Sequence, residues 1–261
     1  MVTNDMNTLK VTPREGYVIV QLDRGKVNAI NAALVEEVRS LFRTLENDPA
    51  VGGVVLTGSS KIFSAGLDLI ELMTYDESGI RSFLTSFGMM HVELSRFSKP
   101  LICAITGFSP AGGTVIAITA DYRVMVDDPK YTLGLNEMAV NVQITRNLTE
   151  AYAFWLGRSL ANRFVLEGKL LNPQEAVTHH LVDEICPQDE VLPRAEQKMQ
   201  HYLKADPDIF SYTKKALRQP WFDAQSMEGQ ADLEQALKIW WKPEVRTKME
   251  ALIASFSNKK K

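Results

Sequence analysis

The chain has 261 residues, of which 45% are hydrophobic and 23% charged, so its composition is that of one large globular domain or a domain with an appendage. A net charge of −3 and a pI of about 5.9 argue against a general attraction to nucleic acid or to anionic membranes. No apolar run reaches the roughly 20 residues of a membrane span, and the first residues lack an apolar signal core, so we expect a cytoplasmic protein.

The first third of the chain predicts strands alternating with helices. Residues 17–22 are apolar and β-branched and predict a strand, followed by a turn at residues 24–26. Asn28 and Asn31 are both candidate caps for the next helix. Its apolar positions have helical spacing: Leu34, Val35, Val38, Leu41, Phe42 and Leu45. That helix ends at Asp48-Pro49, and residues 54–56 predict a second strand.

The same alternation continues to about residue 190. An apolar stripe predicts a helix over residues 80–97, and residues 101–105 form a continuous apolar run that is typical of a strand buried on both faces. Ser109-Pro110 has the pattern of a helix start, with Ser as the N-cap and Pro in the first turn, and we expect this helix to reach about Ala120. Two further short strands are predicted at residues 122–126 and 131–133.

This order of elements places the chain in the α/β class. Beyond about residue 193 the sequence becomes helical and polar, and it contains Trp221, Trp240 and Trp241. We therefore divide the chain into a core, residues 1–192, and a C-terminal helical region, residues 193–261, that packs on its own core or on another subunit.

Three glycine-bearing segments are candidates for a functional site: residues 63–68, 110–113 and 134–137. Each of the first two has the pattern of a strand that runs through a glycine turn into a helix, where backbone N–H groups lack an internal partner. Two such junctions aimed at one point would hold a developing negative oxygen. For each junction alone, the alternative is that glycine only permits close packing or a turn. We expect Asp68 to cap the helix that follows it.

Glu137 is the last residue of the third segment and is a candidate to move a proton. It stands among apolar residues just after a predicted strand, in Leu133-Gly-Leu-Asn-Glu-Met. Apolar surroundings disfavour the ionised form and suit a residue that must both accept and return a proton. The alternative is an exposed loop glutamate, which is the commoner situation.

One motif imitates a serine hydrolase. Residues 107–111, Gly-Phe-Ser-Pro-Ala, nearly match the G-x-S-x-G elbow, and His179 and His180 follow downstream. The elbow takes an oxyanion donor from the N–H of the residue after the serine, and here that residue is Pro110, which has none. This disfavours a hydrolase of that type.

Metal and disulfide chemistry receive no support from the sequence. The two cysteines, Cys103 and Cys186, lie in apolar runs and form no C-x-x-C pair, so we expect them to be small buried residues. The four histidines are scattered without ligand spacing, and no metal site is predicted.

Taken in order, the three segments resemble the crotonase superfamily of enoyl-CoA hydratases and isomerases over about residues 15–190. Further stretches carry the same resemblance: residues 99–107, Ala120-Asp-Tyr-Arg123, Glu175-Ala176 and Leu181-Val-Asp-Glu184. The resemblance implies a spiral of ββα turns with a helical C-terminal region that trimerises, and an acyl-CoA thioester as the substrate. It implies no cofactor, since coenzyme A is part of the substrate, and a homotrimer or hexamer as the assembly.

The resemblance also assigns roles to residues. It implies Glu137 as the base and the N–H groups of Ala65 and Gly112 as the oxyanion donors. The implied substrate-binding residues are Ser64, Gly66, Leu67, Asp68, Val115, Leu135 and Asn136.

One departure from the family's pattern bears on the reaction. Hydratases of this family use two glutamates, and the position of the first is here occupied by Val115, which cannot hold a water or a proton. A shift of a double bond needs only one base. The amino-acid sequence of the three segments is also most similar to that of Δ3,Δ2-enoyl-CoA isomerases. The expected function is therefore the isomerisation of a 3-enoyl-CoA through a dienolate. The alternatives are hydration or another acyl-CoA lyase or hydrolase reaction on the same scaffold, or a non-catalytic acyl-CoA- or RNA-binding relative.

Overall fold

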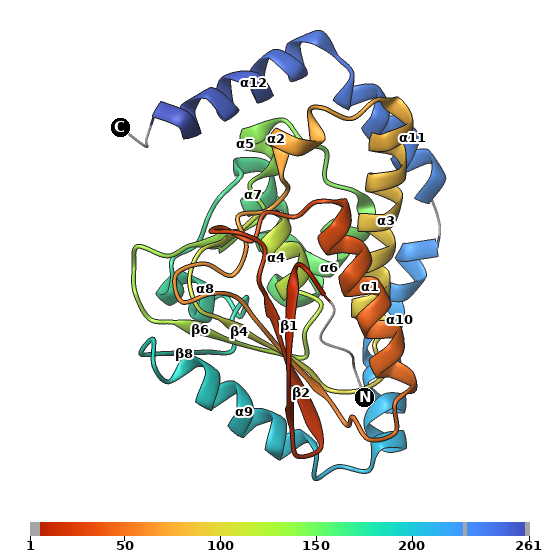
Figure 1. The fold of residues 1–261 in the computed structure, drawn as a ribbon, viewed down its shortest axis with the longest axis vertical. Coiled ribbons are helices and arrows are strands. Elements are labelled where there is room, and N and C mark those ends of the chain that lie inside the picture. The colour runs from red at the N-terminus through yellow and green to blue at the C-terminus, as the bar shows by residue number, and fades with distance from the viewer. Residues whose placement is uncertain (1–5, 227–228, 259–261) are drawn as a thin grey trace.

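A computed structural model describes residues 6–226 and 229–258 of the chain (Figure 1). Its main sheet has six strands in the order β1-β2-β3-β4-β6-β8. β1 and β2 are antiparallel, and every later neighbour pair is parallel. The bounds of these strands are β1 Leu9–Arg14, β2 Tyr17–Leu22, β3 Val54–Thr57, β4 Leu101–Ile105, β6 Tyr122–Val126 and β8 Glu184–Cys186.

Helices cover the sheet on both faces. α9 packs against β3, β4 and β6, whereas α1 and α3 pack against each other on the opposite side of the sheet (Figure 1). Every residue of β3 and β4 is buried, and all of them except Thr57 are apolar. The helices of the first part are α1 Ala32–Asn47, α2 Leu69–Leu72, α3 Glu77–Arg96, α4 Gly112–Ala117, α5 Glu137–Val140, α6 Arg146–Leu156, α7 Arg158–Glu167 and α8 Pro173–Thr178.

Local sequence rules account for most of these elements. All six apolar positions predicted for the first helix are buried in α1, and Asn31, one of the two candidate caps, accepts a hydrogen bond from the Leu34 N–H. The other candidate, Asn28, has a positive φ of 48° and donates to the Phe63 carbonyl instead. Both cysteines are free and buried, as predicted.

The predicted helix start at Ser109-Pro110 is wrong. These two residues form a short strand, β5, which pairs in parallel with β7, Leu133–Gly134, so that Ser109 lies opposite Leu133. α4 begins only at Gly112 and ends at Ala117, after Ala111 as its N-cap residue. The Ser109 N–H is satisfied by the Thr132 carbonyl, and this distant partner decides the conformation rather than the local capping preference.

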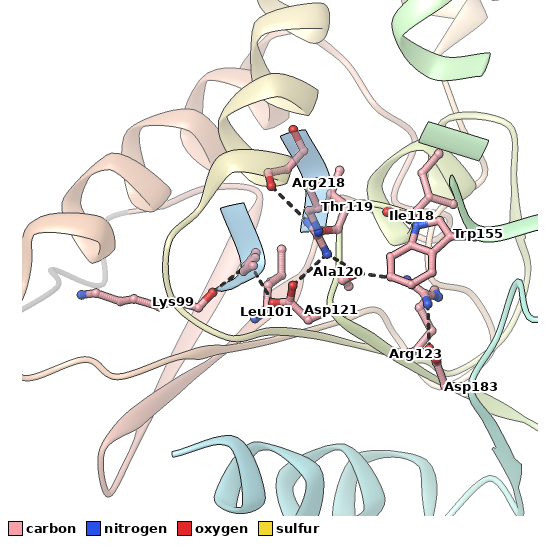
Figure 2. A network of polar contacts seen from close by, with 12 residues as sticks. Lys99, Leu101, Ile118, Thr119, Ala120, Asp121, Arg123, Trp155, Asp183 and Arg218 are labelled. Atoms are coloured by element: carbon pink, nitrogen blue, oxygen red, sulfur yellow. Dashed lines mark hydrogen bonds and ion pairs between the residues drawn. The ribbon is translucent and has the colours of Figure 1, made fainter. Parts of the chain in front are cut away.

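Four helices form the C-terminal part: α9 Val191–Tyr202, α10 Pro207–Ser226, α11 Gly229–Trp240 and α12 Pro243–Asn258. α10 is joined to the core through Asp121, whose carboxylate accepts hydrogen bonds from Lys214 at 2.7 Å and from Arg218 at 2.7 Å. Arg218 also donates to the carbonyls of Ser95, Thr119 and Ala120 (Figure 2). Burial of these charges is acceptable because each one is paired and hydrogen-bonded.

The last helix crosses over the part of the molecule that carries the candidate segments. α12 contacts both α2 and α5, and it lies above them in Figure 1. Arg246 donates to the Met73 carbonyl, and Lys248 donates to the Asn141 side chain. Within the described residues, no helix has the combined length and apolar character that crossing a membrane requires.

Candidate active site

The second and third glycine segments are held together by backbone pairing. β5 and β7 run in parallel, so the residues that follow them, Gly112 and Glu137, leave the small sheet at the same end. The Ala111 N–H donates to the Gly134 carbonyl at 2.9 Å. The Thr114 hydroxyl accepts from the Gly134 N–H at 2.7 Å and donates to the Ser109 carbonyl. The start of α4 and the approach to Glu137 therefore form one hydrogen-bonded unit.

The first segment meets this unit through glycine. A Cβ placed on Gly66 would stand 3.2 Å from the Gly112 nitrogen and 3.2 Å from the Ala111 Cβ. A Cβ on Gly112 would in turn stand 3.4 Å from the Leu67 nitrogen. Gly66 also has a φ of +84°, which favours glycine. The structure thus brings the two predicted junctions together.

The Ala65 amide, however, is not available to a ligand. The N–H of Ala65 donates to the Val27 carbonyl at 3.0 Å, and the N–H of Asp68 donates to the Ile30 carbonyl at 2.9 Å. Leu67, between them, has an N–H with no hydrogen-bond partner among the described residues, and it lies beside Gly112. The prediction of Ala65 as a donor is therefore wrong, because the 27–30 segment already accepts that hydrogen bond. The geometry points to Leu67 in its place.

Gly112 keeps the property predicted for it. As the first residue of α4 it has no carbonyl one turn earlier in the helix, and its N–H meets no acceptor within the described part of the chain. Two amides without partners, those of Leu67 and Gly112, consequently lie side by side and could both donate to one oxygen.

Glu137 is a buried acid. Its exposed fraction is 6%, and among the described residues it is the one aspartate or glutamate that counts as buried. Burial raises the pKa of Glu137 to about 7, and only its own backbone N–H acts in the opposite direction. Its Oε2 has no hydrogen-bond partner in the described structure. Near neutral pH such a carboxyl group can both accept and return a proton.

The remaining predicted residues serve the site in different ways. Ser64 is fully buried, and its hydroxyl donates to the Asn28 carbonyl and accepts from the Gly66 N–H, so it fixes the turn. Asp68 caps α2, as predicted, through the Glu71 N–H and also pairs with Arg24 at 2.7 Å.

Val115 and Leu135 are buried, and they keep the surroundings of the site apolar. The Asn136 Oδ1 is buried, and it finds no partner in the part of the chain that is described. Among the described residues, no group of three His, Cys, Asp or Glu side chains is arranged to hold a metal ion.

Two features of the site were missed by reasoning from the sequence. The availability of the Leu67 amide depends on which carbonyls residues 27–30 present, and no local pattern reports this. Ala111 has φ 48° and ψ −118°, a conformation that strongly favours glycine. The two glycines that follow Ala111 drew attention to the turn but not to the strained residue.

Two known proteins are similar to this chain in sequence over most of its length. Mitochondrial enoyl-CoA delta isomerase 1 of Mus musculus is 30% identical over 246 residues, which cover 94% of this chain and 85% of the mouse protein. The 2,3-dehydroadipyl-CoA hydratase of Escherichia coli K12 is 27% identical over 236 residues, covering 90% of this chain and 89% of that protein.

The fold agrees as well. The crystal structure of human mitochondrial delta3-delta2-enoyl-CoA isomerase matches with a TM-score of 0.94 and 25% identity, over 98% of this chain and 100% of the human one. The family described as enoyl-CoA hydratase/isomerase matches residues 13–261. The chain therefore belongs to the enoyl-CoA hydratase/isomerase family and has the crotonase-type α/β fold with C-terminal helices that its motifs predicted.

Proposed function

We propose that the protein is a Δ3,Δ2-enoyl-CoA isomerase. The observation that carries the proposal is that Glu137, the one buried Asp or Glu among the described residues, lies at the same end of the β5–β7 pair as the Gly112 amide, which has no partner among those residues. The thioester oxygen of a 3-enoyl-CoA accepts hydrogen bonds from the N–H groups of Leu67 and Gly112. These donors stabilise negative charge that develops on this oxygen during the reaction.

The reaction needs one proton to move within the substrate. Ionised Glu137 removes a proton from C2, and the electron pair delocalises into a dienolate whose charge rests on the thioester oxygen. Glu137, now protonated, delivers the proton to C4, and the double bond ends between C2 and C3. The enzyme returns to its starting state, and no other reactant is consumed.

Within the part of the chain that is described, no second buried acid accompanies Glu137, and this disfavours water addition. Val115 is 1% exposed inside α4, and its side chain can neither activate a water nor donate a proton. Hydration needs both of these steps, whereas a double-bond shift needs only a base that later acts as an acid. The mouse and human relatives named as enoyl-CoA isomerases are consistent with this choice.

The test is the conversion of 3-hexenoyl-CoA to 2-hexenoyl-CoA by the wild type and by Glu137→Gln. We expect turnover by the wild type and a loss of at least a hundredfold in the variant, since the amide cannot accept the proton. Formation of 3-hydroxyhexanoyl-CoA from 2-hexenoyl-CoA, or of free CoA from 3-hexenoyl-CoA, as the main activity would replace the proposal by hydration or thioester hydrolysis. Undiminished turnover in Glu137→Gln would remove Glu137 from the mechanism.

We also propose that the protein assembles as a homotrimer or hexamer. An apolar strip on α10 supports this, because Ile209, Tyr212 and Leu217 are 66%, 77% and 67% exposed. Sedimentation velocity of the wild type and of Leu217→Glu tests the assignment. We expect a trimer or larger for the wild type and a smaller species for the variant, whereas a monomeric wild type would contradict it.

A further inference from the structure

The direction of the Leu67 amide follows from the way in which two segments pair. Residues Ile30 and Leu67 form a parallel β-bridge. In it the Ile30 N–H donates to the Gly66 carbonyl at 2.8 Å, and the Asp68 N–H donates to the Ile30 carbonyl at 2.9 Å. In this pattern the residue between the two bonded positions directs its own N–H and C=O groups to the opposite side. The Leu67 N–H therefore faces away from Ile30, and Gly112 lies beside it.

The register of this bridge decides which amide takes that place. A displacement by one residue would turn a neighbouring amide, instead of that of Leu67, toward Gly112. The backbone offers little resistance to such a displacement. Among the described residues, its pairing here consists of the isolated bridge and one further hydrogen bond, from the Ala65 N–H to the Val27 carbonyl. Side-chain contacts are therefore needed to hold the register.

Glu71, on α2, makes such contacts. Its Oε2 accepts a hydrogen bond from Arg24 at 2.8 Å and another from the Asn31 side chain at 2.9 Å. Tyr75 donates to its Oε1 at 2.6 Å. In the chain, Arg24 and Asn31 stand on either side of the residues that pair around Leu67. One carboxylate therefore holds both ends of the pairing segment, four residues after the Leu67 amide.

The partners of Glu71 are themselves fixed in orientation. The Asn31 Oδ1 caps α1, so its Nδ2 is the atom that donates to Glu71, and it donates to both carboxylate oxygens. Arg24 uses Nη1 for the Ala29 carbonyl at 2.8 Å and for Asp68 at 2.7 Å, and it uses Nη2 for Glu71. An amide in place of the carboxylate would set an N–H group against the Asn31 Nδ2, which can only donate.

We propose that Glu71 is a positioning residue that fixes the register between the 27–30 and 65–68 segments and so directs the Leu67 N–H toward the thioester oxygen. Its effect is transmitted through the backbone. An oxyanion donor stabilises the transition state fully only when it is held in place beforehand, and a displacement of about 1 Å can cost as much as a hundredfold in rate. The catalytic meaning of this role rests on the isomerase proposed above, but the fixing of the register does not.

Glu93 offers a matched control. It lies on α3 and accepts hydrogen bonds from two arginines of α1, Arg39 at 3.0 Å and Arg43 at 2.6 Å. Its side chain is 20% exposed, compared with 33% for Glu71. Both carboxylates thus join two elements through arginine, but Glu93 joins elements outside the three glycine segments. If Glu71 only stabilised the fold, Glu71→Gln and Glu93→Gln would behave alike.

The first readout needs no substrate. Hydrogen–deuterium exchange of the full-length protein, followed by mass spectrometry, reports the amides of Ala65 and Asp68, which donate to Val27 and Ile30. We expect these two amides to exchange roughly tenfold faster in Glu71→Gln than in the wild type, because the pairing opens locally more often. In Glu93→Gln they should exchange at the wild-type rate.

The second readout is the separate measurement of kcat and KM for 3-hexenoyl-CoA. We expect kcat to fall roughly tenfold in Glu71→Gln while KM changes less than about twofold, since the donor acts mainly on charge that develops in the transition state. Glu93→Gln should keep the wild-type kcat. An equal loss of kcat in both variants, or unchanged exchange at residues 65 and 68 in Glu71→Gln, overturns the proposal. Faster exchange with an unaltered kcat also overturns it.

Two further outcomes separate this proposal from the proposed function. Faster exchange in Glu71→Gln of a protein that does not isomerise 3-hexenoyl-CoA supports the fixing of the register and contradicts only the isomerase. If Glu71→Gln folds poorly, Arg24→Lys decides, because lysine keeps the charge but lacks the planar fork that joins Ala29, Asp68 and Glu71. Faster exchange at residues 65 and 68 in that variant supports the proposal, and exchange at the wild-type rate overturns it.

Discussion

Gly66 and Gly112 lie back to back, so that a Cβ on Gly66 would stand 3.2 Å from the Gly112 nitrogen. The two residues are far apart in the sequence, and each sits at the turn of a different segment. Their contact brings the amide of Leu67 beside that of Gly112, which is the arrangement that the proposed binding of a thioester oxygen requires. A Cβ on either glycine would lie closer to its neighbours than ordinary van der Waals contact allows, so the neighbours would have to shift.

A methyl group at position 66 should therefore disrupt this arrangement. In Gly66→Ala the new Cβ meets the Ala111 Cβ and the Pro110 carbonyl as well, and the φ of +84° is strained for alanine. We expect kcat for 3-hexenoyl-CoA to fall by about 10²–10³, the cost of losing an oxyanion donor. Gly88→Ala is the matched control, because a Cβ there has no neighbour within 4 Å. Equal activity of both variants would show that the 66–112 contact does not shape the site.

The pH dependence of activity should report Glu137. Burial raises the pKa of this residue to about 7, and the base must be ionised in the free enzyme to accept the C2 proton. We therefore expect kcat/KM to increase with pH up to about 7 and to level off above it. Initial rates between pH 5 and 9 check this. A limb near 4.5, the ordinary value for a glutamate, would indicate that another group controls the rate or that Glu137 is solvated.

The same burial should make Glu137 a cost to the stability of the folded protein. Its pKa is raised in the folded protein from an ordinary value of 4.5 to about 7, so between these values the unfolded chain loses its proton first. The penalty is absent below pH 4.5, grows as the pH rises to 7 and then stays constant. Relative to wild type, the free energy of unfolding of Glu137→Gln should thus gain roughly 3 kcal/mol between pH 4.5 and 7. Urea unfolding at pH 4.5, 6 and 8 measures the difference, and a gain that is independent of pH would contradict this account.

Replacing Ala111 by glycine should stabilise the folded protein. Its φ of 48° with ψ of −118° costs about 1–3 kcal/mol for a residue with a Cβ. Glycine removes this strain but adds about 0.4–1 kcal/mol of unfolded-state entropy. We expect Ala111→Gly to raise the free energy of unfolding by about 1 kcal/mol. Ala117→Gly, in the buried last turn of α4, is the control and should lower it by at least a similar amount. Destabilisation by both changes would mean that Ala111 is not strained.

Helices and strands that local sequence patterns determine were predicted correctly from the sequence. The apolar stripe of α1 and the unbroken run of β4 were located correctly, since periodicity and burial agree there. The Ser109-Pro110 pair failed, because a parallel partner more than twenty residues away took up its backbone groups. Capping rules describe a preference, and a pairing across the chain can override it.

The site was predicted in the same uneven way. Glu137 and Gly112 could be predicted from residue type and sequence context, because one is an acid among apolar neighbours and the other is a glycine at a turn. The sequence could not indicate that the amide of Leu67, rather than that of Ala65, is left without a partner among the described residues. This depends on which amides donate to the carbonyls of residues 27–30.

The Asp121 carboxylate couples the stability of the C-terminal helices to that of the core. Lys214 and Arg218 come from α10, yet they satisfy an acid and carbonyls that belong to residues 95–121. A fragment that ends at residue 192 would lack Lys214 and Arg218, and the Asp121 carboxylate would then have neither of these counter-ions. The predicted boundary near residue 193 is thus a poor place for truncation, and we expect the two parts to melt in a single cooperative transition.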